Sequence, residues 1–300
     1  MLTEAAGGES VRELCENVWN VGHPLFDVYL VRGGERAALV EVGISAVAGR
    51  VVGNLERLGV EPDLLVVTHP HTDHVSGLRP LRERYPDARV VVAPGAREFL
   101  AHPRAAAGFG AEDRFMAEAL RSRGEDGVGP PEAEPPDLGD ADAFAEGARI
   151  DLGELTLEFW EAHGHSPGNL LVRIPERNLI FASDSLGFRY GDGGFMPLFF
   201  TGYGPYLETL ARIRQAAPGI VALGHQGALT GEAARDALAA AEGAARALRE
   251  RVLAHEGTDE ALAEALFAEV YRDELTCYSP ENIRACCGLL IRRVREAGGE

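Results

Sequence analysis

The pattern of hydrophobic and polar residues along the chain predicts a mixed α/β fold. Segments with a periodicity of 3.6 residues predict helices at 46–58 and 75–85. Short apolar, β-branched runs bounded by glycine and proline predict strands at 26–31, 37–42, 64–67, 89–93, 155–160, 170–174 and 179–182. Strands that alternate with helices in this way predict sheets with helices packed outside them.

The end of the chain has a different pattern. From Gly231 onward the sequence is rich in Ala, Leu, Glu and Arg, and it predicts helices at 231–255, 259–273 and 280–297. We therefore expect two parts: a main α/β domain over residues 1–230 and a helical C-terminal extension over residues 231–300 that packs on it. Within the first part, residues 124–148 hold eight acids, four prolines and no Arg, and this predicts an exposed loop.

Charge narrows the range of partners. The 300 residues include 47 acidic and 29 basic side chains, a formal charge of −18, and every basic side chain is Arg. The absence of Lys excludes Schiff-base lysine chemistry and a P-loop, because both need the ammonium group. The acid excess argues against binding to nucleic acid or to an anionic membrane, and favours a small-molecule substrate.

The cellular location is predicted from absences in the sequence. Met1–Ser10 contains no apolar signal segment, and no apolar run approaches 18 residues. The four cysteines, at 15, 277, 286 and 287, form no CxxC pair. Free thiols and no leader predict a cytoplasmic protein, and the sequence leaves a homodimer open.

A histidine-rich cluster follows the predicted strand 64–67. Its donor residues are His69, His71, Asp73 and His74. Imidazoles and carboxylates are the ligands that borderline divalent metals prefer. In an extended segment His69 and His71 point to the same side and can share one metal, which leaves Asp73 and His74 for a second.

Three further donors follow predicted strands elsewhere in the chain: His165 in Gly-His-Ser-Pro-Gly, Asp184 in Ser-Asp, and His225 in Gly-His. Loops at one edge of a sheet converge in space, so we expect these donors to join the cluster. The same Gly164–Gly168 stretch fits the nucleophile elbow of serine hydrolases. That interpretation fails because Pro167 has no N–H for an oxyanion hole and because a strand, not a helix, follows.

The order and spacing of these motifs resemble the metallo-β-lactamase superfamily of binuclear hydrolases. The resemblance implies a four-layer αββα sandwich with two divalent metal ions. It places the first metal on His69, His71 and His165 and the second on Asp73, His74 and His225, with Asp184 as the bridging carboxylate. His163 then remains outside the ligand set, as a structural or supporting histidine.

Within the superfamily, residues 38–45, 161–166 and 206–210 look like stretches of the 2-aminobenzoylacetyl-coenzyme A thioesterases. Glu41, where most members have Asp, is a departure that these thioesterases share. Phe188 stands where they have a glutamate, which leaves the substrate open.

These observations predict a binuclear hydrolase in which a metal-bound hydroxide attacks an activated carbonyl, with a thioester or related ester as substrate and Asp73 also steering protons. A lactonase and a glyoxalase-like hydrolase are alternatives within the fold. A metal-stabilised regulatory protein that binds a partner through its C-terminal helices is an alternative of another class. Mixed His and carboxylate ligands accept zinc, iron and manganese, and the thioesterase likeness favours iron.

Aromatic residues predict where the substrate lies. Seven of the 21 aromatic side chains fall within residues 188–206, just after Asp184. We expect substrate contacts from His23, Phe188, Phe195, Phe199 and Tyr203. The same aromatics are equally compatible with core packing under the helical tail.

Overall fold

Two large β-sheets form the centre of the molecule. The computed structural model describes residues 11–191 and 193–298; Met1–Ser10, on which part of the predicted location rests, lie outside them. The first sheet has seven strands in the order β1 to β7: Arg12–Cys15, Val18–Asn20, Tyr29–Arg32, Ala37–Val40, Leu64–Val66, Arg89–Val92 and Asp142–Ala143. Strands β1 to β4 are antiparallel, and β4 to β7 run parallel to one another.

The second sheet has six strands, and a small hairpin lies beside it. In the order β8, β9, β10, β11, β14 and β15 the strands are Arg149–Asp151, Thr156–Ala162, Asn169–Ile174, Leu179–Phe181, Ile220–Ala222 and Ala228–Thr230. Only the β11–β14 pair in this sheet is parallel. The hairpin joins β12 (Phe188–Tyr190) to β13 (Gly194–Met196).

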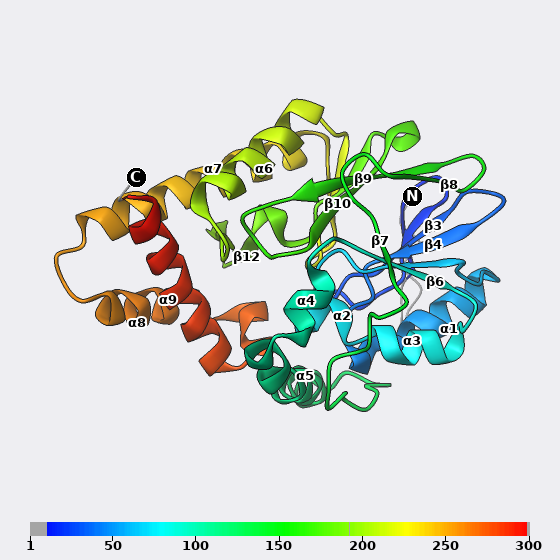
Figure 1. The fold of residues 1–300 in the computed structure, drawn as a ribbon, viewed down its shortest axis with the longest axis horizontal. Coiled ribbons are helices and arrows are strands. Elements are labelled where there is room, and N and C mark those ends of the chain that lie inside the picture. The colour runs from blue at the N-terminus through cyan, green and yellow to red at the C-terminus, as the bar shows by residue number, and fades with distance from the viewer. Residues whose placement is uncertain (1–10, 192, 299–300) are drawn as a thin grey trace.

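Helices cover both outer faces (Figure 1). Those before the second sheet are α1 (Ala48–Leu58), α2 (Thr72–Val75), α3 (Leu78–Arg84), α4 (Ala96–Ala101) and α5 (Pro103–Ser122). The later ones are α6 (Tyr203–Ala216), α7 (Gly231–Ala254), α8 (Asp259–Val270) and α9 (Pro280–Ala297). Short 3₁₀ turns occupy Ser45–Val47, Pro175–Arg177, Ser183–Leu186 and Asp273–Cys277.

Strand alternation explains the layering. In β4, Ala38 and Val40 pack between the two sheets, whereas Ala37 and Leu39 pack under the helices on the outer face. In β10, Val172 faces the layer between the sheets and Leu171 faces the opposite, helix-covered side. A period of two therefore buries both faces of each sheet, and the predicted αββα arrangement is confirmed.

The C-terminal helices divide into two groups. α7 packs against β13 and β15 and so belongs to the outer helix layer of the second sheet. α8 packs on α9, and α9 packs on α7 and α6, at the end of the molecule opposite α1 and α3 (Figure 1). The sequence predicted that all three helices form one extension, whereas in the structure α7 belongs to the helix layer of the second sheet.

The acidic segment 124–148 is more ordered than a solvated connector. It is mostly exposed, but Leu138 and Ala141 are buried, and Asp142–Ala143 form β7. A Cβ at Gly110 of α5 would lie 2.2 Å from the carbonyl oxygen of Ala133, so the segment packs closely on this helix. Several of its acids pair with Arg side chains, including Arg82 with Asp140. Tertiary packing thus orders a segment whose composition predicts no regular structure.

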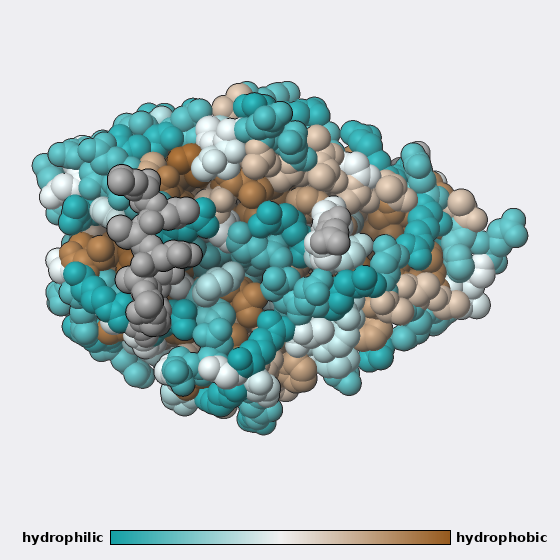
Figure 2. Space-filling view, turned by 180° about the vertical axis from the view of Figure 1, so that it is seen from behind, coloured by the Kyte–Doolittle hydropathy of each residue, from teal (hydrophilic) through white to brown (hydrophobic). Residues whose placement is uncertain are grey.

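Surface polarity agrees with the composition. Figure 2 shows hydrophilic side chains over most of the face opposite to Figure 1, with hydrophobic ones gathered in smaller areas between them. No helix in the part of the chain that the structure describes is long and apolar enough to cross a membrane.

Candidate metal centre

The seven predicted donors meet at one edge of the two sheets. The cluster 69–74 follows β5, while His165, Asp184 and His225 follow β9, β11 and β14. The first helical turn begins earlier than predicted: α2 starts at Thr72 rather than Val75, so Asp73 and His74 project from this turn. This correction explains how His69 and His71, in extended chain, diverge from Asp73 and His74.

The first donor group contains His69, His71, His165 and Asp184, whose ligating atoms lie within 4.8 Å of one another. Nε2 of His165 lies 3.2 Å from Nε2 of His69. Oδ2 of Asp184 lies 3.7 Å from His165 Nε2 and 3.9 Å from His69 Nε2.

The second donor group contains Asp73, His74, His225 and again Asp184. The Nε2 atoms of His74 and His225 are 3.2 Å apart, and Asp73 Oδ2 lies 3.3 Å from each. The other carboxylate oxygen of Asp184, Oδ1, faces this group at 3.5 Å from His74 Nε2 and 3.4 Å from His225 Nε2. Asp184 thus offers one oxygen to each group.

Hydrogen bonds fix the orientation of three of the imidazole rings. Nδ1 of His165 donates to the Leu198 carbonyl at 2.8 Å, and Nδ1 of His225 donates to the Leu25 carbonyl at 2.6 Å. Nδ1 of His74 lies 3.0 Å from the Glu41 carboxylate. In each ring the opposite nitrogen, Nε2, is therefore left to face the centre, which is the usual arrangement of a metal-ligating histidine.

Glycine permits the close approach of these loops. A Cβ at Gly224 would lie 2.5 Å from Cε1 of His74, so no other residue fits before His225. Gly164 has φ +96° and its missing Cβ would meet the backbone of Tyr206 at 2.3 Å. The glycines of the two Gly-His motifs are therefore packing requirements of the centre.

Burial lowers the pKa of the donor histidines, whereas neighbouring carboxylates raise it. Burial lowers the pKa of His71 to about 3 and holds the pKa of His69 well below its usual value. Burial would also lower the pKa of His74, but the carboxylates of Asp73, Glu41 and Asp184 raise it well above the usual value. The second group is thus the more negative of the two.

The residues fit a pair of metal cations. With Nδ1 of His165 and of His225 committed to carbonyl oxygens, their Nε2 lone pairs point at a neighbouring imidazole nitrogen only 3.2 Å away. Two buried carboxylates, Asp184 and Glu41, and the half-buried carboxylate of Asp73 add negative charge in the same small volume. A cation within each group satisfies both the lone pairs and the carboxylates, and the donor types suit zinc, iron or manganese.

Comparison with known proteins agrees with this geometry. The model of the metallo-beta-lactamase superfamily matches residues 27–225, a range that includes every donor. The chain belongs to this superfamily.

Two curated relatives of this superfamily member are hydroxyacylglutathione hydrolases. The one from Ruegeria pomeroyi is 29% identical over 160 residues, which cover 53% of this chain and 47% of that protein. The one from Synechococcus is 44% identical over 63 residues, which cover 21% of this chain and 25% of that protein. The chain thus spans about half of the first relative's length and a quarter of the second's. The likeness to 2-aminobenzoylacetyl-coenzyme A thioesterases stays a prediction.

Solved structures show the same fold at low sequence identity. A metallo-beta-lactamase superfamily protein from Sulfolobus tokodaii superposes with a TM-score of 0.60 at 19% identity, covering 94% of this chain and 99% of the other. One from Thermus thermophilus gives 0.63 at 20% identity with 95% of each chain covered. A beta-lactamase domain protein from Burkholderia ambifaria gives 0.64 at 20% identity, covering 97% of this chain and 90% of the other.

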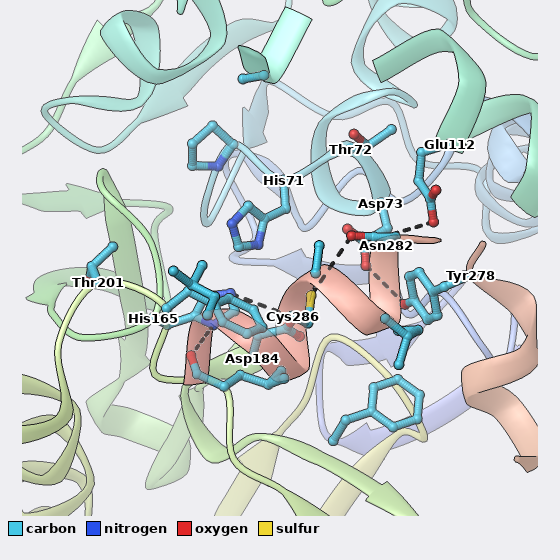
Figure 3. Close-up of a pocket in the computed structure, with 18 of the residues that line it drawn as sticks. His71, Thr72, Asp73, Glu112, His165, Asp184, Thr201, Tyr278, Asn282 and Cys286 are labelled. Carbon is cyan, nitrogen blue, oxygen red and sulfur yellow. Dashed lines mark hydrogen bonds and ion pairs between the residues drawn. The ribbon is translucent and has the colours of Figure 1, made fainter. Parts of the chain in front are cut away.

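A cavity of about 470 Å³ opens beside both donor groups, and the side chains of His71, Asp73, His165 and Asp184 reach it (Figure 3). Its opposite wall comes from the C-terminal region, including Leu275, Tyr278, Asn282, Ile283 and Cys286. The Tyr278 hydroxyl donates to Asp73 Oδ2 at 2.9 Å and lies 3.2 Å from Nε2 of His225. No sequence signal singled out this tyrosine, because it lies 205 residues from its partner.

Of the five predicted substrate contacts, the structure places only Phe188 in the cavity wall. Phe195 lines a separate small cavity, and Phe199 is fully buried against the rings of Tyr203 and Tyr206. These three aromatics are core or rim packing, which corrects the sequence-based expectation.

Strand alternation accounts for one of these outcomes. In β13, Met196 lines the cavity and its neighbour Phe195 faces the other way, because successive side chains of a strand point to opposite sides. Beyond the strand, Leu198, Phe200 and Thr201 line the cavity, whereas Phe199 is buried in the core.

The two uncertain histidines also lie outside the cavity. His23 is buried, and its Nε2 lies 3.2 Å from Glu125 of the acidic segment. His163 has a 67% exposed side chain, and it lies 4.0 Å from Glu161 rather than beside a donor. The side chain that supports the centre is instead Glu41, which orients the donor His74. Glu41 also accepts a hydrogen bond from the Thr68 hydroxyl at 2.7 Å.

Proposed function

We propose that this protein is a binuclear metal-dependent hydrolase that cleaves an ester or thioester. The observation that carries the proposal is Asp184, whose two oxygens face two separate donor groups at the floor of a cavity. A binding protein needs no such pair of groups open to a cavity large enough for a small molecule.

The proposed ligands are His69, His71 and His165 for one ion and Asp73, His74 and His225 for the other, with Asp184 shared. Bound at these positions, the metals would supply an activated water molecule and polarise a carbonyl oxygen. The ring orientations set by Leu198, Leu25 and Glu41 hold the donors in place without reorganisation.

Side chains of the chain itself serve the reaction around this centre. Asp73 accepts the Tyr278 hydroxyl proton in a hydrogen bond, so this pair can hold a proton beside the cavity. The apolar wall excludes bulk water and strengthens the electrostatic interactions at the floor. A carbonyl that enters beside His71, His165 and Asp184 would therefore meet the donor groups where most of the surrounding wall is apolar (Figure 3).

A second candidate, hydrolysis of a hydroxyacylglutathione, is favoured by the names of the two curated relatives. This activity is also thioester hydrolysis, so it shares the proposed chemistry and differs only in the group that the cavity must hold.

The test combines metal analysis with a substrate panel. Protein purified without chelator should contain close to two equivalents of zinc, iron or manganese. It should hydrolyse at least one member of a panel of thioesters, aryl esters, lactones and hydroxyacylglutathione. Chelation should abolish that activity, and re-addition of the metal should restore it. Full metal occupancy without turnover of any substrate would instead favour the regulatory alternative.

A further inference from the structure

The walls of the cavity are apolar on three sides. α4 and α5 contribute Phe99, Leu100 and Phe109, the segment after β12 contributes Met196, Leu198 and Phe200, and the C-terminal region contributes Leu275, Ile283 and Leu289. Phe200 also contacts the rings of His71 and His165, with centroids at 6.1 and 5.5 Å. The apolar surface thus begins directly at the first donor group.

Apart from the metal positions proposed at the donor groups, the cavity offers almost no free positive charge. Among its described lining residues only Arg293 is basic. Its Nε donates to the Phe200 carbonyl at 2.7 Å, and its Nη1 pairs with Glu296 at 2.6 Å. The guanidinium is therefore committed to fixing α9 against the body.

The remaining charged group is also committed to structure. Glu112 of α5 accepts from Ser279 N at 3.0 Å, from Ser279 Oγ at 2.6 Å and from Asn282 Nδ2 at 3.0 Å. These bonds hold the first turn of α9 and leave the carboxylate oriented toward the helix rather than toward a ligand (Figure 3).

From these walls and charges we infer the substrate class, on the basis of the proposed function. The site takes an ester or thioester with an apolar acyl or aryl group and an uncharged leaving group. The carbonyl lies at the polar floor, and the apolar group extends between α5, Phe200 and α9. The carboxylates of glutathione and the phosphates of coenzyme A lack cationic partners in this cavity.

The reaction is ordinary hydrolysis. Water adds to the carbonyl carbon, the C–S or C–O bond to the leaving group breaks, and the products are a carboxylic acid and a thiol or alcohol. No oxidant, reductant or further reactant is needed.

The first experiment varies one part of the substrate at a time on the metal-loaded protein. Acetyl, butyryl, hexanoyl and octanoyl thioesters are prepared on three thiols: neutral N-acetylcysteamine, glutathione and coenzyme A. We expect kcat/KM to rise roughly two- to fourfold per methylene until the cavity is filled. For a given acyl chain, the N-acetylcysteamine thioester should exceed the glutathione thioester at least tenfold. A flat chain-length profile, or a preference for glutathione or coenzyme A, would overturn the inference.

A matched pair of variants locates the acyl group. Ala105 lines the cavity, whereas Ala107, two residues further along α5, is exposed and does not line it. Ala105→Phe should shorten the acyl chain at which kcat/KM is greatest, and Ala107→Phe should leave the profile unchanged. An unchanged profile in Ala105→Phe, with its metal content retained, would place the acyl group elsewhere.

A binding measurement separates this inference from the proposed function. Calorimetry of acetate and octanoate with the metal-loaded protein reports on the cavity without any turnover. Octanoate should bind at least tenfold more tightly than acetate, whether or not any ester is hydrolysed. Tight octanoate binding without hydrolysis would refute the hydrolase and keep the apolar pocket. Hydrolysis with equal affinity for the two acids would refute the apolar pocket and keep the hydrolase.

Discussion

The donor floor of the cavity and its C-terminal wall are built in different ways. The floor is formed by polar residues in short motifs at strand ends, and its imidazole rings are oriented by hydrogen bonds to the carbonyls of Leu25 and Leu198 and by the carboxylate of Glu41. The wall is formed by apolar side chains of the C-terminal region, which lie beside others from α4, α5 and the β13 region up to 190 residues away in the chain, as Phe99 does beside Leu289. Polar contacts that hold it in place include those of Glu112, Arg293 and Tyr278.

We therefore expect the floor to determine the chemistry and the wall to determine the substrate preference. A change in the floor should alter metal content and the rate with every substrate. A change in the wall should alter which substrate is preferred or how firmly the helices are held. The following variants test this division, from the largest expected effect to the smallest.

Asp184→Asn removes the carboxylate that both donor groups share. We expect loss of at least one metal equivalent and a fall in kcat/KM of roughly a thousandfold or more, because an amide cannot supply two anionic oxygens. Metal analysis and kinetics on one preparation measure both effects. The exposed Asp236→Asn is the control for loss of one charge. Unchanged metal content in Asp184→Asn would contradict the bridging assignment.

Glu41→Gln affects the floor without touching a donor position. The carboxylate that faces Nδ1 of His74 is lost, and metal affinity should fall roughly 10- to 100-fold. Competition with a chromogenic chelator measures this affinity. Glu35→Gln, on the exposed surface, should leave it unchanged. A normal affinity in Glu41→Gln would mean that His74 is oriented without help from Glu41.

Tyr278→Phe lies where the wall meets the floor. It removes the 2.9 Å hydrogen bond to Asp73, and we expect kcat to fall about tenfold with both metals retained, since a hydrogen bond to a charged group contributes about 1.5 kcal/mol. Tyr190→Phe, whose hydroxyl contacts Glu269 instead, is the matched control. If Tyr278→Phe changed KM alone, the hydroxyl would act in substrate binding and not in the chemical step.

Glu112→Gln loosens the wall alone. Loss of the charged acceptor for Ser279 and Asn282 should lower the free energy of unfolding by about 1 to 2 kcal/mol. Hydrogen exchange should increase mainly over 279–286. Glu118→Gln, on the exposed face of the same helix, provides the comparison. Equal exchange in the two variants would show that apolar packing by itself holds the start of α9.

The sequence predicted the floor well because its signals are local. Strand ends, glycines and donor residues lie within a few positions of one another, so 69–74 and the two Gly-His motifs could be recognised without tertiary information. The helices at 231–255, 259–273 and 280–297 were likewise predicted close to their observed bounds, because their periodicity is long and uninterrupted.

The wall could not be predicted in this way. Whether Phe195 or Met196 faces the cavity depends on the phase of β13, and Tyr278 reaches Asp73 through the packing of the start of α9 against α5. The composition of 124–148 also predicted only an exposed loop, whereas β7 and the contact with Gly110 order this segment. In each case long-range packing decides a position that local pattern leaves open.

The Tyr278 hydroxyl joins the two regions, because it contacts both Asp73 and His225. Metal affinity and the docking of the C-terminal helices are then thermodynamically linked, and the coupling is reciprocal. A ligand that binds only when the helices are docked would raise metal affinity by the same factor by which metal raises the affinity for that ligand. In the proposed metal centre, the docking of the C-terminal helices would therefore help to set the metal concentration at which the site fills.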